Sequence, residues 1–376
     1  NLLINGKMNK NFKITIVAGA RPNFMKIAPI IHEINKINAN REILSYRLVH
    51  TGQHYDQNMS YSFFEQLKIP EPNINLNCSG ASQAEMTANI MLKFENELIK
   101  NKSDLVLVVG DVNSTMACAI VAQKLKIKVA HVEAGIRSND WSMPEEINRL
   151  VTDRITNYFF TTSQNANKNL INEGVDKKNI FFVGNTMIDT LKNNLKNLKK
   201  PDFWDNFSLK KKNYFVLTLH RPSNVDNGKK LYNTISKIVD YSKNLPIVFP
   251  MHPRTKKIFK SLKISNPNLH IVSPLSYFEF NYIVKNSFAV ITDSGGITEE
   301  TTFLGIPCIT LRNTTERPET INYGTNELIG ENPNALPSVL EKLFSGNWKK
   351  GSIPDLWDGN SAQRIIKKIL DLNKLK

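Results

Sequence analysis

Short apolar runs rich in Val and Ile alternate with longer amphipathic stretches along the chain, and this pattern predicts β-strands connected by helices. Residues 13–20 (KITIVAGA) predict a buried strand, and residues 22–37 predict a helix with Pro22 in its first turn. Further strands are expected at residues 45–52, 104–111, 128–135 and 157–163. Because strands alternate with helices of crossover length, we expect a parallel sheet with both faces covered.

The apolar rhythm lapses at residues 191–213, where Lys, Asn and Pro are frequent, and then resumes. Strands are expected again at residues 214–220, 245–252, 269–274, 288–295 and 306–311, and a last helix at residues 361–370. We therefore predict an α/β protein of two doubly wound, Rossmann-like domains that face a central cleft. The N-terminal domain takes residues 8–190, the C-terminal domain takes residues 191–355, and residues 356–376 pack back on the N-terminal domain as a helix.

The charge of the chain narrows the class of protein only slightly. The 49 Lys and Arg residues exceed the 34 Asp and Glu residues, and a net charge of +15 would suit nucleic acid, acidic lipid or a phosphorylated small molecule. Much of the excess lies in residues 191–200 and 208–213, which is typical of solvated helix faces and a linker. No nucleic-acid-binding motif accompanies it, so we expect no nucleic acid partner.

Apolar runs in this chain are too short to span a membrane, and no signal peptide is visible near Met8, so a cytoplasmic protein without a membrane partner is expected. Cys78, Cys118 and Cys308 are far apart and form no CxxC pair, which indicates neither a disulfide framework nor a zinc site. Cys118 lies in an apolar helical stretch and is expected in the core. No metal-binding cluster is visible.

Polar residues recur where the predicted strands end, and ligands of open α/β sheets bind outside the carboxyl ends of strands. The residues at these ends are Arg21, Gln53, His54, Asp111, Glu133, His220, His252 and Asp293. Each has a local structural alternative. Asp111 could cap a helix begun at Asn113, and Glu145 and Glu146 could favour the first turn after Pro144. Their recurrence in both halves of the chain nevertheless predicts a ligand site.

Residues 293–300 (DSGGITEE) indicate a more specific chemistry. Small residues open a predicted helix here, so backbone N–H groups can approach an anion, and the helix dipole favours a phosphate. The stretch has neither the GKT of a Walker loop nor GxGxxG, so a nicotinamide site has no support. Glu300 lies two turns along, in a position to accept hydrogen bonds from a sugar diol. The spacing favours a nucleotide, with a Gly-rich helix cap as the alternative.

The chain resembles the non-hydrolysing UDP-N-acetylglucosamine 2-epimerases from Lys13 to its last helix. The resemblance rests on the order and spacing of the blocks GARPNFMKIAPI, TGQHYDQ, GDVNSTMA, HVEAGIRS, MPEEINRLVTD, GNTMIDTL, LTLHRPSN, TDSGGITEETTFLGIPC and TTERPE. It implies the two-domain fold of the GT-B glycosyltransferases, with UDP held mainly by the second domain. It also implies a homodimer that makes UDP-N-acetylmannosamine for surface polysaccharide.

The reaction that the resemblance implies needs no cofactor: anti elimination of UDP across C1–C2 gives 2-acetamidoglucal, and UDP re-adds after C2 is reprotonated from the other face. Asp111, Glu133 and Glu145 match the family's catalytic carboxylates, and His220 matches its histidine near the diphosphate. Proton removal and return on opposite faces need more than one carboxylate. A set of like charges held close together can supply both an acid and a base.

The resemblance also implies a set of substrate-binding residues. These are Arg21, Lys26, Phe280, Ser294, Gly295, Gly296, Glu300 and Arg317. The fork of Arg21 suits phosphate oxygens, residues 294–296 match the phosphate-binding turn, and Glu300 matches the ribose ligand. Phe280 falls where the family stacks a ring on uracil, whereas periodicity alone places it in the core.

Two departures from the better-known bacterial members leave other functions open. Residues 220–224 read HRPSN where those members carry HRREN, and residues 75–85 lack their Arg-Gln pair, which argues against allosteric activation by a second UDP-N-acetylglucosamine. One alternative is a 2-epimerase of a modified sugar nucleotide such as a UDP-2,3-diacetamido-glucuronic acid. Others are a hydrolysing 2-epimerase, whose first block differs, and a GT-B glycosyltransferase, which has no need of the three carboxylates.

Overall fold

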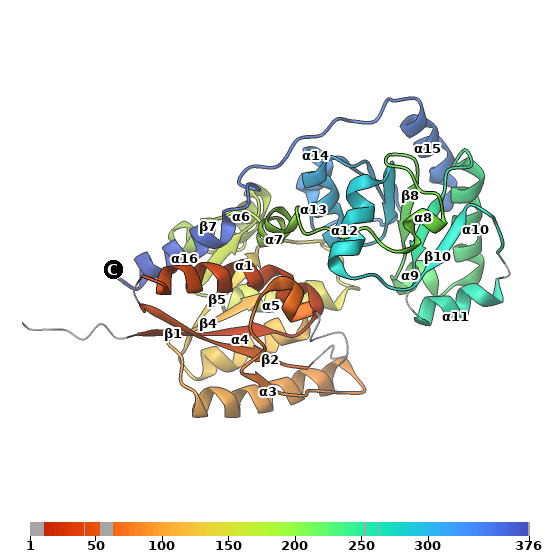
Figure 1. Ribbon diagram of the computed structural model, residues 1–376. Helices are drawn as coiled ribbons and strands as arrows, with labels where there is room; N and C mark the ends of the chain where they lie inside the picture. Colours follow the sequence, from red (N-terminus) through yellow and green to blue (C-terminus); the bar gives the residue numbers. More distant parts are fainter. Residues whose placement is uncertain (1–10, 41, 53–62, 252, 263, 375–376) are drawn as a thin grey trace, which may run out of the picture. The chain divides into compact units, whose positions relative to one another are not determined.

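The structure is a computed structural model that describes residues 11–40, 42–52, 63–251, 253–262 and 264–374. The chain divides into two compact units, one formed by the described residues up to Thr190 and from Asp355 onward, the other by Leu191–Pro354. Each unit contains one parallel sheet flanked by helices (Figure 1). The prediction of an α/β protein with two doubly wound sheets is confirmed. Gln53, His54 and His252 lie outside the described residues.

Unit 1 contains a parallel sheet in the order β3-β2-β1-β4-β5-β6-β7. Its strands are β1 (Phe12–Ala18), β2 (Leu44–His50), β3 (Ile74–Asn75), β4 (Leu105–Val109), β5 (Lys128–Ala134), β6 (Tyr158–Thr161) and β7 (Ile180–Phe182). The order of the strands reverses between β1 and β4. In doubly wound sheets a ligand crevice forms at such a switch point, so the residues that follow β1, β4 and β5 are placed for function.

The helices of unit 1 pack apolar side chains against this sheet. They are α1 (Arg21–Asn38), α3 (Gln83–Lys100), α4 (Asn113–Lys124), α5 (Pro144–Arg154), α6 (Gln164–Asn172), α7 (Thr186–Asn194) and α16 (Ser361–Leu372), with a short 3-10 turn at Lys177–Asn179. The chain terminus returns to unit 1, where α16 lies beside α1 (Figure 1). Trp357 anchors this return, since its indole N–H donates to the carbonyl of Thr162 at 3.0 Å and the side chain is buried.

Unit 2 contains a parallel sheet in the order β10-β9-β8-β11-β12-β13. Its strands are β8 (Phe215–Thr218), β9 (Ile247–Pro250), β10 (Leu269–Val272), β11 (Ala289–Thr292), β12 (Cys308–Thr310) and β13 (Asn326–Leu328). Its helices are α8 (Phe203–Asn206), α9 (Pro222–Val225), α10 (Gly228–Tyr241), α11 (Pro253–Ser261), α12 (Tyr277–Asn286), α13 (Gly295–Leu304), α14 (Pro318–Asn322) and α15 (Leu336–Phe344), with a 3-10 turn at Pro333–Ala335. Here the order reverses between β8 and β11, which precede His220 and Asp293.

The structure departs from the sequence-based expectation at three short strands. Strands β3, β7 and β13 have two or three residues each and lie at sheet edges, so they carry too short an apolar pattern to be recognised. Helix α4 begins at Asn113, as the sequence suggested, with Val112 as its N-cap residue, and a capping role of the neighbouring Asp111 stays a prediction. Cys118 is buried in α4 as predicted. No helix within the described ranges has the length and hydropathy of a membrane span.

Candidate active site

Glu133 lies at the carboxyl end of β5 in a strained backbone conformation. Its φ is +74°, a left-handed value that costs a residue with a Cβ about 1–2 kcal/mol. The register between β5 and β6 shifts between Val132 and Ala134, so Glu133 is the extra residue of a β-bulge. A bulge re-aims one side chain against the alternation of the strand. The local strain therefore serves to place this carboxylate, which is 2% exposed.

Lys26, on the second turn of α1, provides the positive charge that Glu133 needs. Its Nζ lies 2.7 Å from Glu133 Oε1, and both side chains are buried. Gly110 makes room for this contact, since a Cβ there would lie 3.4 Å from Lys26 Nζ and 3.3 Å from Asn23 Nδ2. Gly110 itself has a φ of +71°. A buried carboxylate without such a cation would be strongly destabilising, so Lys26 offsets the cost of burying the Glu133 carboxylate.

Asp111 follows β4 and remains partly open to solvent, with 24% of its side chain exposed. Helix α5 contacts it twice. The Asn148 amide donates to the Asp111 carbonyl oxygen at 2.9 Å, and Arg149 Nη1 lies 3.3 Å from Asp111 Oδ2. Helix α5 therefore contacts both the backbone and the carboxylate of Asp111.

The two adjacent glutamates of α5 differ completely in their surroundings. Glu146 is 1% exposed and accepts three hydrogen bonds of 3.0 Å, from Ser138 N, Ser138 Oγ and Asn139 N. Glu145 stands in the first turn of α5, is half-buried, and makes no hydrogen bond or ion pair with another described residue. Glu146 thus holds the loop that follows β5, and Glu145 is the member of the pair that remains available for chemistry.

A buried network supports the backbone on both sides of these carboxylates. His131, fully buried on β5, contacts Asp153 Oδ1 through Nδ1 at 2.7 Å and the Gly110 carbonyl through Nε2 at 2.8 Å. Arg137 lies 2.7 Å from Asp153 Oδ2. Burial by itself would raise the pKa of Asp153, but the charges and hydrogen bonds of His131 and Arg137 together hold it below its usual range. The network ties β5 to the loop that ends in Asp111.

In unit 2, Asp293 orients His220. The Asp293 carboxylate is fully buried and lies 2.6 Å from His220 Nδ1, while it accepts further hydrogen bonds from His220 N, Arg221 N and Asn224 Nδ2. Burial would raise the pKa of Asp293, but His220 and these donors hold it below its usual range. The His220 side chain is 58% exposed. Its Nδ1 is therefore fixed while most of the side chain stays open to solvent, as in an acid–base histidine.

The glycine turn opens α13 as predicted, with Ser294 as N-cap and Gly295 as first helical residue. The surroundings of the two glycines differ. A Cβ on Gly295 would lie 2.4 Å from Glu316 Oε1, so the turn accommodates the ion pair that Glu316 forms with Arg312. A Cβ on Gly296 would meet nothing within 4 Å. There is thus open space beside Gly296 in the first turn of α13, the end of a helix that favours an anion.

Glu300, further along α13, is a buried carboxylic acid. It is 4% exposed, and burial raises its pKa to about 7, although Tyr277 and Asn281 act in the opposite direction. Asn281 Nδ2 donates to Glu300 Oε1 at 3.2 Å. The neighbouring Phe280 on α12 is half-buried and packs in part against the apolar cluster of unit 2. It is therefore only partly the core residue that periodicity predicts.

Two arginines of the predicted site have partners inside their own units. Arg317 is 4% exposed, and its Nε lies 2.6 Å from Glu299 Oε1, on the helix that carries the glycine turn. Arg21 begins α1, and its guanidinium lies over the Phe63 ring at 5.0 Å from the centroid. Burial lowers the pKa of Arg21.

Comparison with known proteins decides the family. The family model described as UDP-N-acetylglucosamine 2-epimerase matches residues 36–370. The chain belongs to the UDP-N-acetylglucosamine 2-epimerase family. The resemblance drawn from the sequence blocks is confirmed.

Among relatives of this epimerase family, the UDP-N-acetylglucosamine 2-epimerase of Methanocaldococcus jannaschii is 42% identical over 94% of this chain and 98% of its own. A UDP-2,3-diacetamido-2,3-dideoxy-D-glucuronate 2-epimerase of Pseudomonas aeruginosa is 38% identical over 85% of this chain and 88% of its own. The crystal structure of the M. jannaschii enzyme in complex with UDP-GlcNAc and UDP matches with a TM-score of 0.86 and 41% identity, covering 96% of this chain and 100% of that one.

The fold of the epimerase family gathers the predicted residues within each unit. In unit 1, Lys26 meets Glu133, and α5, the helix that carries Glu145, contacts Asp111 through Asn148 and Arg149. In unit 2, the strand ends of β8 and β11 bring His220 to the glycine turn, through Asp293. Asp293 was predicted only as one of the polar residues at strand ends, with no role beside His220, and Arg149 was not predicted as part of the site. The position of Asp293 directly before the glycine turn could have indicated its role. No local sequence pattern indicates a role for Arg149.

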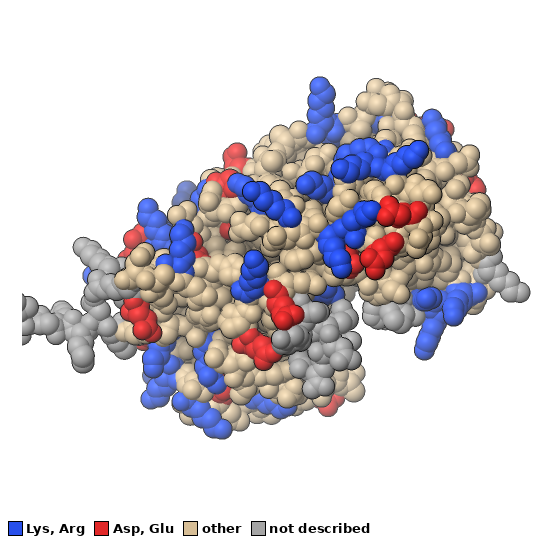
Figure 2. Space-filling view, in the orientation of Figure 1, with Lys and Arg blue, Asp and Glu red and all other residues tan. Residues whose placement is uncertain are grey.

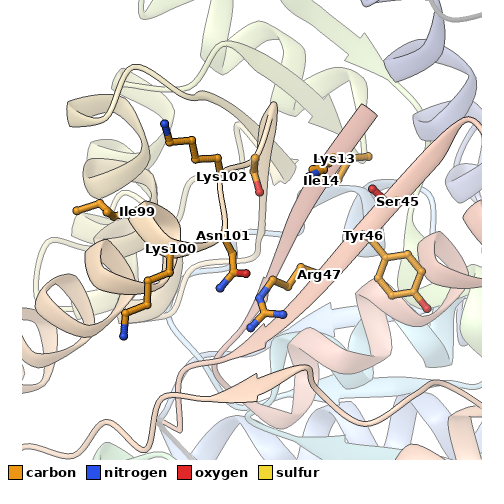
Figure 3. Close-up of a pocket in the computed structure, with 10 residues that line it drawn as sticks. Lys13, Ile14, Ser45, Tyr46, Arg47, Ile99, Lys100, Asn101 and Lys102 are labelled. Atoms are coloured by element: carbon orange, nitrogen blue, oxygen red, sulfur yellow. The ribbon is translucent and has the colours of Figure 1, made fainter. Parts of the chain in front are cut away.

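The pocket in Figure 3 lies away from these residues of the epimerase-family chain. It has a volume of about 440 Å³ and is lined by the first residues of β1 and β2 and by the end of α3. These are the amino ends of the strands, opposite to the ends that carry Asp111 and Glu133. Arg47, which points into it, is paired with Glu97. Basic side chains on the face in Figure 2 are scattered, with acidic ones between several of them, as expected for a solvated Lys-rich surface.

Proposed function

We propose that this protein interconverts UDP-N-acetylglucosamine and UDP-N-acetylmannosamine by epimerisation at C2, as a supply of the latter for surface polysaccharide. The observation that carries the proposal is the strained Glu133, held by Lys26 beside the loop of Asp111. Backbone strain persists where the surrounding structure enforces it, and it concentrates at catalytic sites. Membership of the family supports the same substrate.

The proposed mechanism is an elimination followed by re-addition. The C1–O bond breaks and its electrons leave with UDP, one carboxylate takes the C2 proton, and the C1=C2 bond of 2-acetamidoglucal forms. A second carboxyl group then returns a proton to the opposite face of C2, and UDP oxygen re-adds to C1. Because the C2 hydrogen is weakly acidic, cleavage of C1–O runs ahead and builds positive charge on the sugar. The carboxylates Asp111, Glu133 and Glu145 stabilise that charge and exchange the protons.

The leaving diphosphate requires groups that stabilise negative charge. We propose that His220, oriented by Asp293, donates from Nε2 to the departing oxygen. The turn at Ser294, Gly295 and Gly296 binds phosphate through backbone N–H groups at the start of α13. Because these donors are fixed before the reaction, they lose no energy to reorganisation when the charge develops.

The remaining substrate-binding residues complete the proposed nucleotide site. Glu300 accepts hydrogen bonds from the ribose diol, and Phe280 stacks on uracil. Arg21 contacts phosphate, and Lys26 acts through Glu133, with which it is paired. Arg317 acts through Glu299 rather than by direct contact, because its guanidinium is buried against that carboxylate.

Proton NMR of the protein with UDP-N-acetylglucosamine in D₂O tests the proposal. UDP-N-acetylmannosamine that carries deuterium at C2, without net release of UDP, is the expected product. Free N-acetylmannosamine would instead place the chain among hydrolysing epimerases. Asp111→Asn, Glu133→Gln and Glu145→Gln should each reduce turnover severely with little change in UDP affinity, whereas Glu95→Gln, on the exposed face of α3, serves as the matched control. Normal turnover in all three would overturn the mechanism.

A second candidate substrate is a UDP-2,3-diacetamido-2,3-dideoxy-D-glucuronate, as in the P. aeruginosa relative. The same C2 chemistry would serve both sugars, since neither the C3 substituent nor the C6 carboxylate takes part in the elimination. The net charge of +15 is compatible with the more anionic sugar. Parallel assays of both substrates distinguish them through the ratio of kcat/KM values, which is expected to favour UDP-N-acetylglucosamine.

A further inference from the structure

The side chain of Arg149 is a fully buried charge near the candidate carboxylates. It lies on α5, one turn after the two glutamates, with 1% of its side chain exposed. Its Nε is 3.0 Å from Glu146 Oε2, and its Nη1 is 3.3 Å from Asp111 Oδ2. None of its three nitrogens makes a directed hydrogen bond among the described residues. The guanidinium therefore holds both carboxylates by charge.

The two carboxylates that meet this guanidinium serve different purposes. Glu146 is buried and already accepts three hydrogen bonds from the loop after β5, so it anchors Arg149 to that loop. Asp111 remains partly exposed and is the one that a substrate can reach. A guanidinium does not lose its proton in a protein, so its buried charge has to be matched by carboxylates that stay ionised.

We propose that Arg149 is a positioning residue that keeps Asp111 ionised and at a fixed distance from α5, the helix that carries Glu145. This inference rests on the proposed epimerase function. It assigns roles that the sequence left open: Asp111 is the permanently anionic carboxylate, which accepts a proton or stabilises positive charge. Glu145, which has no cation beside it among the described residues, is the carboxyl group able to hold and deliver a proton.

Arg149→Met removes the charge and keeps most of the volume, and Arg149→Lys keeps the charge without the fork. In the epimerisation assay, Arg149→Met is expected to lower kcat at least about 100-fold with KM changed less than about threefold. Arg149→Lys should recover part of the loss, because an ammonium can serve only one of the two carboxylates well. Arg154→Met, on an exposed position of the same helix, is the matched control and should keep wild-type kcat.

A double-mutant cycle decides whether Arg149 acts through Asp111. If it does, adding Arg149→Met to an Asp111→Asn enzyme costs no further activity, and the two losses are far from additive. Losses that multiply, or a wild-type kcat in Arg149→Met, would overturn the inference. If the wild-type protein turns over neither UDP-sugar, the proposed function fails. The double-mutant cycle is then carried out on protein stability, with the melting temperatures of the same four proteins as the measured quantity. There the double variant should lose less than the two single variants combined, whereas additive losses would refute the pairing.

Discussion

Glu300 offers a prediction in which stability and binding move in opposite directions. Burial raises its pKa to about 7, against an ordinary value of 4.5. A carboxyl group with a raised pKa favours the folded state while it is protonated, so its contribution is complete below pH 4.5 and is lost as the pH rises through 7. The shift corresponds to about 3 kcal/mol of folding free energy that the ionised form removes at high pH.

Replacement of Glu300 by Gln removes the ionisation and keeps the shape and one hydrogen-bond acceptor for Asn281. We expect Glu300→Gln to be more stable than wild type at pH 8.5 by up to about 3 kcal/mol, and the gap to close by pH 4.5. For a unit the size of Leu191–Pro354 this is a rise of several degrees in Tm. The difference in Tm between the two proteins at one pH isolates Glu300, because the titration of all other groups affects the stability of both proteins equally.

Thermal denaturation of the ligand-free proteins between pH 4.5 and 8.5 measures this gap. Glu341→Gln, on an exposed position of α15, is the control and should show no pH-dependent gap. Equal Tm values for wild type and Glu300→Gln at pH 8.5 would refute the reasoning, as would a gap that persists unchanged at pH 4.5.

Binding of UDP should respond in the opposite direction. A ribose diol donates hydrogen bonds, and it binds the ionised carboxylate better than the acid. We therefore expect the UDP affinity of wild type to exceed that of Glu300→Gln by a ratio that grows from pH 6 to pH 8. The titration of UDP itself cancels in this ratio. A constant ratio, measured by calorimetry, would mean that Glu300 does not contact the nucleotide in its ionised form.

Three further predictions test other parts of the site. Asp293→Asn should lower kcat at least tenfold while the fold is kept, since His220 loses the carboxylate that orients it. Epimerisation rates measure kcat and circular dichroism checks the fold. An unchanged kcat would contradict this prediction. Lys26→Met should destabilise the protein by about 3–5 kcal/mol because Glu133 is left unpaired, and Glu133→Gln in addition should restore Tm without activity. Gly295→Ala should weaken UDP binding at least tenfold in a calorimetric titration, because its Cβ displaces a buried ion pair; wild-type affinity would refute this.

The local pattern of the sequence was sufficient for the main strands, the crossover helices and the glycine turn. Apolar periodicity reports burial of one face of an element, and that burial is the same whichever neighbour covers it. Residues at strand ends were also predictable, because all parallel strands of a sheet direct their carboxyl ends to one edge. The blocks of the epimerase family added the identity of the carboxylates.

Only the tertiary structure decided which charges are paired. Lys26 and Glu133 are 107 residues apart, and nothing in either segment indicates the contact. The local pattern does not distinguish Glu145 from Glu146, since both are first-turn acids of one helix, and only the resemblance to the family pointed to Glu145. The energy of a charge in a protein depends on the dielectric and on the countercharges within a few ångströms, which long-range packing supplies. The sequence alone therefore predicted where charge gathers, and the fold decided which of those charges are held and which remain available to act.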